Sequence, residues 1–168
     1  EKREGSGESG WVRSRHRDWF LALAEEAQQH ATGPQQGIWL QRLETERDNL
    51  RAALAWCEAD TQGAQSGLRL TAALAWFWRV RGHLREGLSY LTRALEREDA
   101  RVPTGARAQA LQGAGNLAFH RGENTQARTF LEEGLRLFRE QEDRRGIAYS
   151  LLDLSSVATA QADYGRVH

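Results

Sequence analysis

The sequence predicts an all-α protein, and more narrowly a right-handed α-solenoid built from antiparallel helix hairpins. Apolar residues recur at three- and four-residue steps along most of the 168 residues, and no segment keeps the two-residue alternation of a strand. Segments 81–96 and 121–136 also align with each other at a constant offset of 40 residues. Such a period is typical of stacked helical units, because each unit needs neighbours to bury its apolar face.

The first expected element is a helix from Val12 to Ala31, where Leu23 and Ala27 belong to the apolar stripe. Residues 1–10 precede it and are charged and rich in glycine and serine, so we expect a disordered linker there. The segment 32–34, Thr-Gly-Pro, should end the helix, because proline lacks the amide hydrogen that a helix needs.

A second helix is expected from Gln36 to Ala59. Its apolar stripe contains Leu40, Leu43, Leu50, Leu54 and Cys57. Arg47 lies in the same stripe, and we expect it to be a boundary residue paired with Glu44 or Asp48. Together with the polar turn up to residue 66, the two helices would form an N-terminal helical hairpin over residues 11–66.

The remaining chain is predicted to hold repeats over residues 67–168. The expected helices are Gly67–Arg81, Leu84–Arg97, Ala106–Arg121, Asn124–Gln141 and Arg145–Ala160. They divide into units 67–105 and 106–144 and a truncated third unit, 145–168. Thr104 stands where its hydroxyl would cap the helix that follows.

Four small residues mark equivalent places in the two full units. Gly82 and Gly122 each follow a first helix, where a tight turn favours positive φ. Gly87 and Ala127 occupy the same place five residues further on, where a small side chain would let the paired helices approach closely. We therefore assign these residues to the architecture and give them no chemistry.

Composition excludes several classes of protein. Lysine plus arginine equals aspartate plus glutamate at 23 each, so we expect no direct binding of nucleic acid by this segment. Cys57 is the only cysteine, which excludes an internal disulfide and favours the cytoplasm. No apolar run approaches the roughly 20 residues of a membrane span. We also expect the chain to be part of a longer protein, because it lacks an initial methionine and a new helix begins near its end.

No catalytic, cofactor-binding or metal-binding motif emerges from the residue pattern. The glycine cluster at 113–115 lies within a helical pattern and lacks the Gly-Lys-Ser/Thr of a phosphate loop. Histidines occur singly, without zinc-site spacing. We therefore expect a non-catalytic protein without cofactor or metal. The alternative is a hydrolase or transferase that uses a groove with Cys57 or His120 as its reactive group.

The candidate binding surface is the concave side, which the first helix of each unit should line. Counting from the aligned positions, this surface contains Arg69, Trp76, Arg79, Gln109, Gln112, Asn116, Phe119, His120, Tyr149, Ser156 and Thr159. The six tryptophans mostly have the spacing of packing residues. Trp76 is the exception, because Leu74 and Trp78 already take the packing face. A solvated groove without a ligand is the competing interpretation.

The repeat positions resemble the tetratricopeptide repeat. Its slots for small and apolar residues are occupied by Ala114-Gly115, Ala118, Gly122, Ala127, Leu131 and Gly134. The period near 40 residues exceeds the usual 34 of that family, which places the extra residues in longer helices and loops.

The upstream region has a second resemblance. It contains the strings HRDWFLALA at 16–24, WLQRLE at 39–44, DNLRAALAW at 48–56 and WRVRGH at 78–83. This order of motifs is similar to the helical arm of bacterial STAND-type predicted ATPases and LuxR-type, MalT-like transcriptional regulators. The resemblance implies a cytoplasmic interaction or sensor arm of a multidomain signalling protein. The family's nucleotide-binding motifs have no matching positions here.

The expected partners follow from this interpretation. They are a protein or peptide on the concave face, a small effector, or the ATPase domain of the same polypeptide. The face of residues 149–160 would otherwise lie uncovered, so self-association is a further expectation.

Overall fold

The computed structural model describes residues 2–167, with side chains over 7–165. The helices are α1 (Lys2–Gln29), α2 (Gln36–Thr45), α3 (Arg47–Ala59), α4 (Ala64–Arg81), α5 (Leu84–Glu96), the 3₁₀ helix η1 (Glu98–Ala100), α6 (Gly105–His120), α7 (Asn124–Glu140) and α8 (Arg144–Val167). No strand occurs between residues 2 and 167, so the prediction of an all-α protein is confirmed. None of these helices is both long and apolar enough to cross a membrane.

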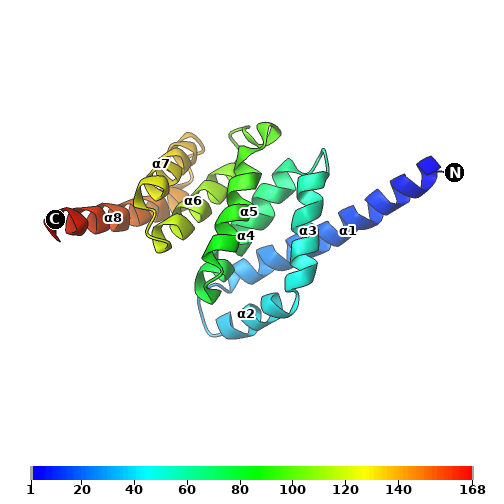
Figure 1. Cartoon of the computed structure of the whole chain (residues 1–168), viewed down its shortest axis with the longest axis horizontal. Helices are drawn as coiled ribbons and strands as arrows, with labels where there is room; N and C mark the ends of the chain where they lie inside the picture. Colours follow the sequence, from blue (N-terminus) through cyan, green and yellow to red (C-terminus); the bar gives the residue numbers. More distant parts are fainter. Residues whose placement is uncertain (1, 168) are drawn as a thin grey trace.

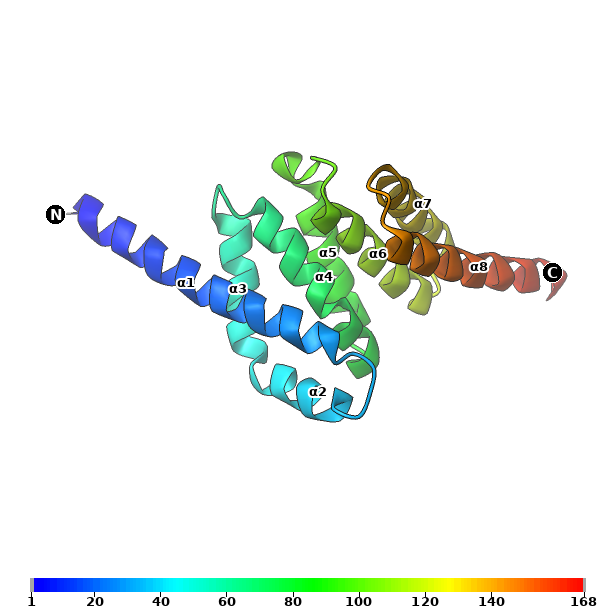
Figure 2. The ribbon, with the colours of Figure 1, turned by 180° about the vertical axis from the view of Figure 1, so that it is seen from behind.

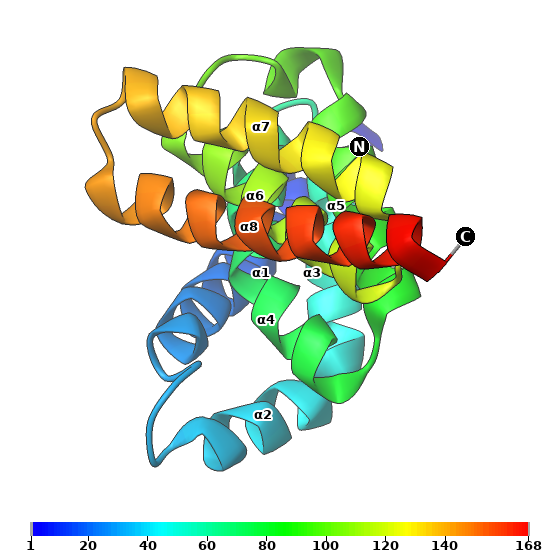
Figure 3. The same ribbon diagram turned by 90° about the vertical axis from the view of Figure 1, so that its left-hand side faces the viewer.

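Each helix packs on helices one to three places away along the chain. Helix α4 contacts α5 and α6, α6 contacts α7, and α7 contacts α8, while α1 lies against α3 and α4. The first and last helices project at opposite ends of the molecule (Figure 1), and the view from behind shows α1 crossing α3 and α4 (Figure 2). Helix α2 stands apart from the α6–α8 end (Figure 3). One apolar core runs through the array, from Phe20 of α1 to Val157 of α8.

Three helices each end in a turn of the same type. Gly82, Gly122 and Glu142 follow α4, α6 and α7 with φ of 76°, 81° and 56°. In each turn the next residue's amide donates to a carbonyl five residues earlier. These bonds run from His83 to Trp78 at 2.8 Å, from Glu123 to Ala118 at 2.9 Å and from Asp143 to Phe138 at 2.9 Å. This is the Schellman pattern, and the predicted positive φ of both glycines is confirmed.

Close helix packing explains the other small residues. A Cβ on Gly87 would lie 2.7 Å from the Trp78 ring, and one on Gly115 would lie 2.5 Å from Cγ of Leu131. Ala127 is fully buried. A larger side chain at any of these places would have to displace its neighbour, so the sequence-based interpretation of Gly87 and Ala127 is confirmed.

The expected linker is helical instead. Helix α1 begins at Lys2, so residues 2–10 are its first turns, whereas Glu1 lies outside the described residues. The helix is anchored by Ser14, whose hydroxyl accepts from Trp56 Nε1 at 3.1 Å, and by Arg13 over the Trp56 ring. Backbone hydrogen bonding propagates from such an anchor without requiring burial, and composition alone does not reveal it.

The expected helix from Gln36 to Ala59 is broken at Glu46, with φ of −90° and ψ of 10°. The break turns α2 toward the end of α1. There Gln36 Nε2 donates to the carbonyl of Ala31 at 2.7 Å, and the Trp39 ring stacks on His30. These contacts with the segment just before α2 accompany the bend, although the apolar stripe continues through it.

Other local predictions hold, with shifted boundaries. The Thr104 side chain accepts from the Arg107 amide at 3.2 Å and caps α6 as expected. Helix α4 starts three residues earlier than predicted and α8 extends to Val167, with His168 outside the described residues. How the helices group into repeat units stays a prediction.

Candidate functional site

The eleven predicted binding residues, called the inner face below, lie on three helices. Arg69, Trp76 and Arg79 belong to α4, Gln109, Gln112, Asn116, Phe119 and His120 to α6, and Tyr149, Ser156 and Thr159 to α8. Helix α6 contacts both α4 and α8, so these residues come from adjacent helices.

Two of the three α4 residues of the inner face are already engaged within the chain. Arg69 binds Glu25 of α1, with 3.3 Å between Nε and Oε2. Trp76 is only 8 % exposed, and its Nε1 has no hydrogen-bond partner among the described residues. The expectation that Trp76 offers its ring to a ligand is therefore wrong in this conformation. Arg79 remains exposed.

Helix α6 supplies a row of polar side chains. Gln109, Gln112 and Asn116 follow one another at steps of three and four residues, which places them on one side of the helix. His120 continues this row, and its Nδ1 lies 2.9 Å from the Asn116 carbonyl oxygen. Phe119 is different, because it packs against the apolar core. The α6 row thus presents carboxamides and an imidazole.

Asp153 on α8 faces this row, although it is not among the predicted binding residues. Asn116 Nδ2 donates to its Oδ1 at 3.4 Å, and Gln112 also hydrogen-bonds the carboxylate. Burial raises the pKa of Asp153, while the two amides, His120 and Arg79 partly oppose the rise. The available signal was an acid inside the otherwise apolar run 151–154.

The α8 members of the inner face do not form one group. Tyr149 is 49 % exposed and holds the Arg145 guanidinium over its ring. Ser156 donates its hydroxyl proton to the Leu152 carbonyl at 3.2 Å. Thr159 is six residues beyond Asp153, which turns it by about 240° around the helix. Thr159 therefore lies on another side of α8, away from Asp153.

The site centred on Asp153 is chemically a recognition surface. A half-buried carboxylate, two carboxamides, a guanidinium and an imidazole offer donors and acceptors of both charge signs. The structure shows no group of three potential metal ligands within its described part. Such a set can hydrogen-bond a polar chain or small molecule.

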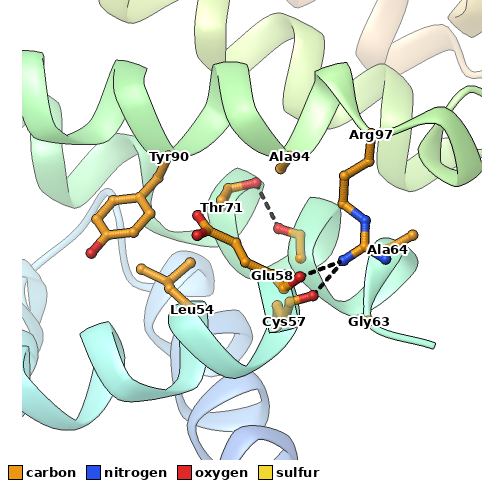
Figure 4. Close-up of a pocket in the computed structure, with 10 residues that line it drawn as sticks. Leu54, Cys57, Glu58, Gly63, Ala64, Thr71, Tyr90, Ala94 and Arg97 are labelled. Carbon is orange, nitrogen blue, oxygen red and sulfur yellow. Dashed lines mark hydrogen bonds between the residues drawn. The ribbon is translucent and has the colours of Figure 1, made fainter. Parts of the chain in front are cut away.

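A separate pocket lies between α3, α4 and α5 (Figure 4). It includes Cys57, Thr71, Tyr90 and Arg97, and Arg97 Nη1 donates to the Cys57 carbonyl at 2.6 Å. The cavity is about 10 Å³, which is roughly the space of one water molecule. It is too small for a substrate.

Cys57 and His120 are not brought together. Cys57 is 3 % exposed on α3, and burial raises the pKa of its thiol to about 11. His120 is at the exposed end of α6 and does not line the Cys57 pocket. The prediction that Cys57 is a small buried apolar residue is confirmed, and the arrangement gives it no base partner.

Comparison with known proteins points to one class, the transcriptional regulators. The chain is 41 % identical over 121 residues to a protein of Mycobacterium tuberculosis named "Putative HTH-type transcriptional regulator". A protein of the same name from Mycobacterium bovis has the same identity over the same length. The match covers 70 % of this chain but 13 % of each relative, so the chain spans a small part of their length.

Other comparisons add no name. No protein-family model matches the chain, and no solved structure matches it. The relatives' names describe regulators of transcription.

Proposed function

We propose that this chain is a non-catalytic helical arm of a larger cytoplasmic transcriptional regulator, and that the inner face around Asp153 binds a protein segment or an effector. The observation that carries the proposal is the Asp153 cluster, which three side-by-side helices build from α6 carboxamides, Arg79 and His120. The similarity to regulators, of which this chain matches only 13 %, supports an accessory role within a longer polypeptide.

The finer identity remains part of this proposal. We infer a right-handed solenoid of tetratricopeptide-like units in the arm of a STAND-type or LuxR-type regulator. The recurring Schellman turns and the neighbour-to-neighbour packing support it. In such an arm the ligand would be a protein partner, a small effector or the regulator's own ATPase domain.

Selection of peptide ligands tests the inner face. Peptides selected from a random display library on the purified chain should bind about tenfold more weakly to Asn116→Ala, because one good polar contact contributes roughly 1.4 kcal/mol. The matched control is Gln126→Ala, an exposed amide on α7. Fluorescence anisotropy with labelled peptides measures both. Unchanged affinity in Asn116→Ala, or an equal loss in Gln126→Ala, would contradict the proposal.

The Trp76→Ala variant tests the core, because the Trp76 ring is buried. It removes a core side chain, so its effect on peptide binding should accompany a loss of stability of about 3 kcal/mol or more. If Trp76→Ala lost peptide binding without losing stability, Trp76 would instead be part of the ligand site.

The enzymatic alternative finds no support in the geometry. A reactive thiol needs exposure and a lowered pKa, and Cys57 has neither. We accordingly propose no catalytic step.

Binding of DNA by this segment is a separate question. The relatives' names include a helix-turn-helix element, and they do not support our expectation that the segment itself avoids nucleic acid. We still infer from the zero net charge that it binds no duplex. Anisotropy of a labelled duplex at 50 mM salt measures this, and a salt-sensitive rise would overturn it.

A further inference from the structure

Asp153 lies on the packed side of α8, toward α6. Ser150 and Val157 are fully buried on this helix, and Asp153 stands between them at steps of three and four residues, which places all three on one side. The contact of Asp153 with Asn116 of α6 is made from the same side. The carboxylate therefore occupies a packing position and not the exposed side of α8.

The packing of neighbouring helices does not itself require an acid at this position. At the offset of 40 residues, the positions equivalent to Asp153 hold Gly113 in α6 and Ala73 in α4. Ala73 is buried, and a Cβ on Gly113 would lie 2.9 Å from Cβ of Ala75, so Gly113 faces α4 as Asp153 faces α6. Small, uncharged residues thus serve where the other helices meet.

The Asp153 charge has no cationic partner inside the described chain. Asp153 forms no ion pair with residues 7–165, and its hydrogen-bond partners there are the neutral amides of Asn116 and Gln112. A partly buried carboxylate without a cation costs free energy of folding, because burial removes the water that would solvate the charge. Such a charge, in a position that small residues fill elsewhere, is typical of a site that receives a ligand.

Arg79 supplies the opposite charge on the same face. It is exposed near the end of α4, has no ion-pair partner among the described residues, and is near enough to act on Asp153 electrostatically. Helix α6, which carries Gln112 and Asn116, contacts both α4 and α8. The three helices therefore present an unpaired guanidinium, a row of carboxamides and an unpaired carboxylate, in that order.

From this arrangement we propose that the inner face binds an extended protein segment with a basic side chain at Asp153 and an acidic side chain at Arg79. The proposal rests on the function proposed above and adds the charge pattern of the ligand. A chain fits better than a small molecule, because the two charges come from different helices and neither residue lines the pocket of Figure 4. The carboxamides between the charges can pair with the N–H and C=O groups of such a segment.

The stability of the free chain tests the cost of the charge. Asp153→Asn keeps the size of the side chain and removes its charge, so its urea midpoint at pH 7 should rise by a few tenths of a molar. Glu132→Gln, exposed on α7, is the matched control and should leave the midpoint unchanged. An unchanged or lower midpoint in Asp153→Asn would show that the carboxylate is part of the folding interactions and would overturn the proposal.

Peptide selection tests the charge pattern. Peptides that the display library yields on wild type, and that bind Asn116→Ala more weakly, should be enriched in sequences with both a basic and an acidic residue. Peptides that depend on Asn116 without this enrichment would overturn the inference and leave the proposed function intact. If no selected peptide depends on Asn116, the proposed function and the inference are both wrong.

Paired substitutions assign the basic residue of a selected peptide to Asp153. Its replacement by glutamine should weaken binding to wild type about 10- to 100-fold, because a charge-assisted contact with a half-buried carboxylate is lost. The same replacement should have almost no effect on binding to Asp153→Asn, because the contact is already absent there. Fluorescence anisotropy measures both. Equal losses on wild type and on Asp153→Asn would contradict the pairing.

The acidic residue of the peptide is assigned to Arg79 in the same way. Its replacement by glutamine should weaken binding to wild type and leave binding to Arg79→Gln nearly unchanged, with a smaller loss because Arg79 is exposed. Arg139→Gln, exposed on α7, is the matched control and should bind the peptide like wild type. If Arg139→Gln lost as much affinity as Arg79→Gln, the effect would come from net charge, and the assignment would fail.

Discussion

Glu142 is the one non-glycine residue with positive φ between residues 2 and 167, in a turn that elsewhere uses glycine. A side chain in the left-handed region is disfavoured by roughly 1–2 kcal/mol, and part of that is regained by the lower chain entropy of the unfolded state. We expect Glu142→Gly to raise the unfolding free energy by about 0.5–1 kcal/mol.

Urea denaturation measures this change, and Gly122→Ala provides the opposite control. A Cβ on Gly122 would meet no atom within 4 Å, so its expected loss of about 1 kcal/mol comes from backbone conformation alone. A destabilised Glu142→Gly would show that the Glu142 side chain contributes more than its backbone costs.

Burial of Cys57 predicts a dependence of stability on alkaline pH. The pKa of its thiol is raised from 9.0 to about 11 in the folded chain, so the neutral thiol is favoured by folding. This contribution is complete below pH 9 and is lost as pH rises through 11, by up to roughly 3 kcal/mol.

Urea midpoints of wild type and Cys57→Ser at pH 8 to 11 isolate the thiol from the other alkaline titrations. Wild type should lose more stability than the serine variant across this range. Parallel curves would mean that the thiol has the same pKa in the folded and unfolded chains.

At the scale of elements, Glu86 joins α3 to α5. Its carboxylate accepts from Arg51 Nε at 2.8 Å and from Arg47 Nη2 at 2.8 Å. Arg47 also pairs with Glu44 as predicted, whereas Asp48 pairs with Arg51. The Arg51 guanidinium, assisted by Arg47, lowers the pKa of Glu86 below its ordinary 4.5.

Replacing Glu86 by glutamine should therefore cost about 1 kcal/mol at pH 7. Because the folded pKa is lowered, this contribution is present above pH 4.5 and disappears as pH falls through the folded value. Thermal unfolding at pH 3 to 7 should show the gap between wild type and Glu86→Gln closing in acid. Glu132→Gln, exposed on α7, should show no gap, and a pH-independent gap at residue 86 would exclude the ionic origin.

The N-terminal region contains two helices, α2 and α3, where the apolar periodicity predicted one. The apolar stripe of residues 40–57 continues through Glu46, and so the pattern predicted one helix. The bend follows from the packing of Trp39 on His30 and the bond of Gln36 to Ala31. These partners lie outside the helix that the apolar stripe describes, and the stripe alone does not indicate contacts beyond its own helix.

Across the whole molecule, contacts concentrate in the middle of the array. Helix α6 packs on α4, α5, α7 and α8, whereas α2 makes few contacts with any helix. Local opening requires less free energy where fewer buried contacts break. Amide hydrogen exchange should therefore be slowest in α4 and α6, and fastest in α2 and in residues 2–10.

Hydrogen exchange followed by mass spectrometry resolves these segments. Uniform protection along the chain would indicate one globally cooperative unit and contradict a graded array.

The sequence by itself determined the all-α class, the turns at Gly82 and Gly122, the Thr104 cap and the burial of Cys57. These features depend on local periodicity and on backbone conformations that few residues adopt, so nearby residues are sufficient to predict them. Tertiary structure alone decided the break at Glu46, the burial of Trp76 and the placement of Asp153 beside Asn116. Each of these depends on contacts outside the residue's own helix, and the way in which helices and loops pack is set by tertiary structure rather than by one helix alone.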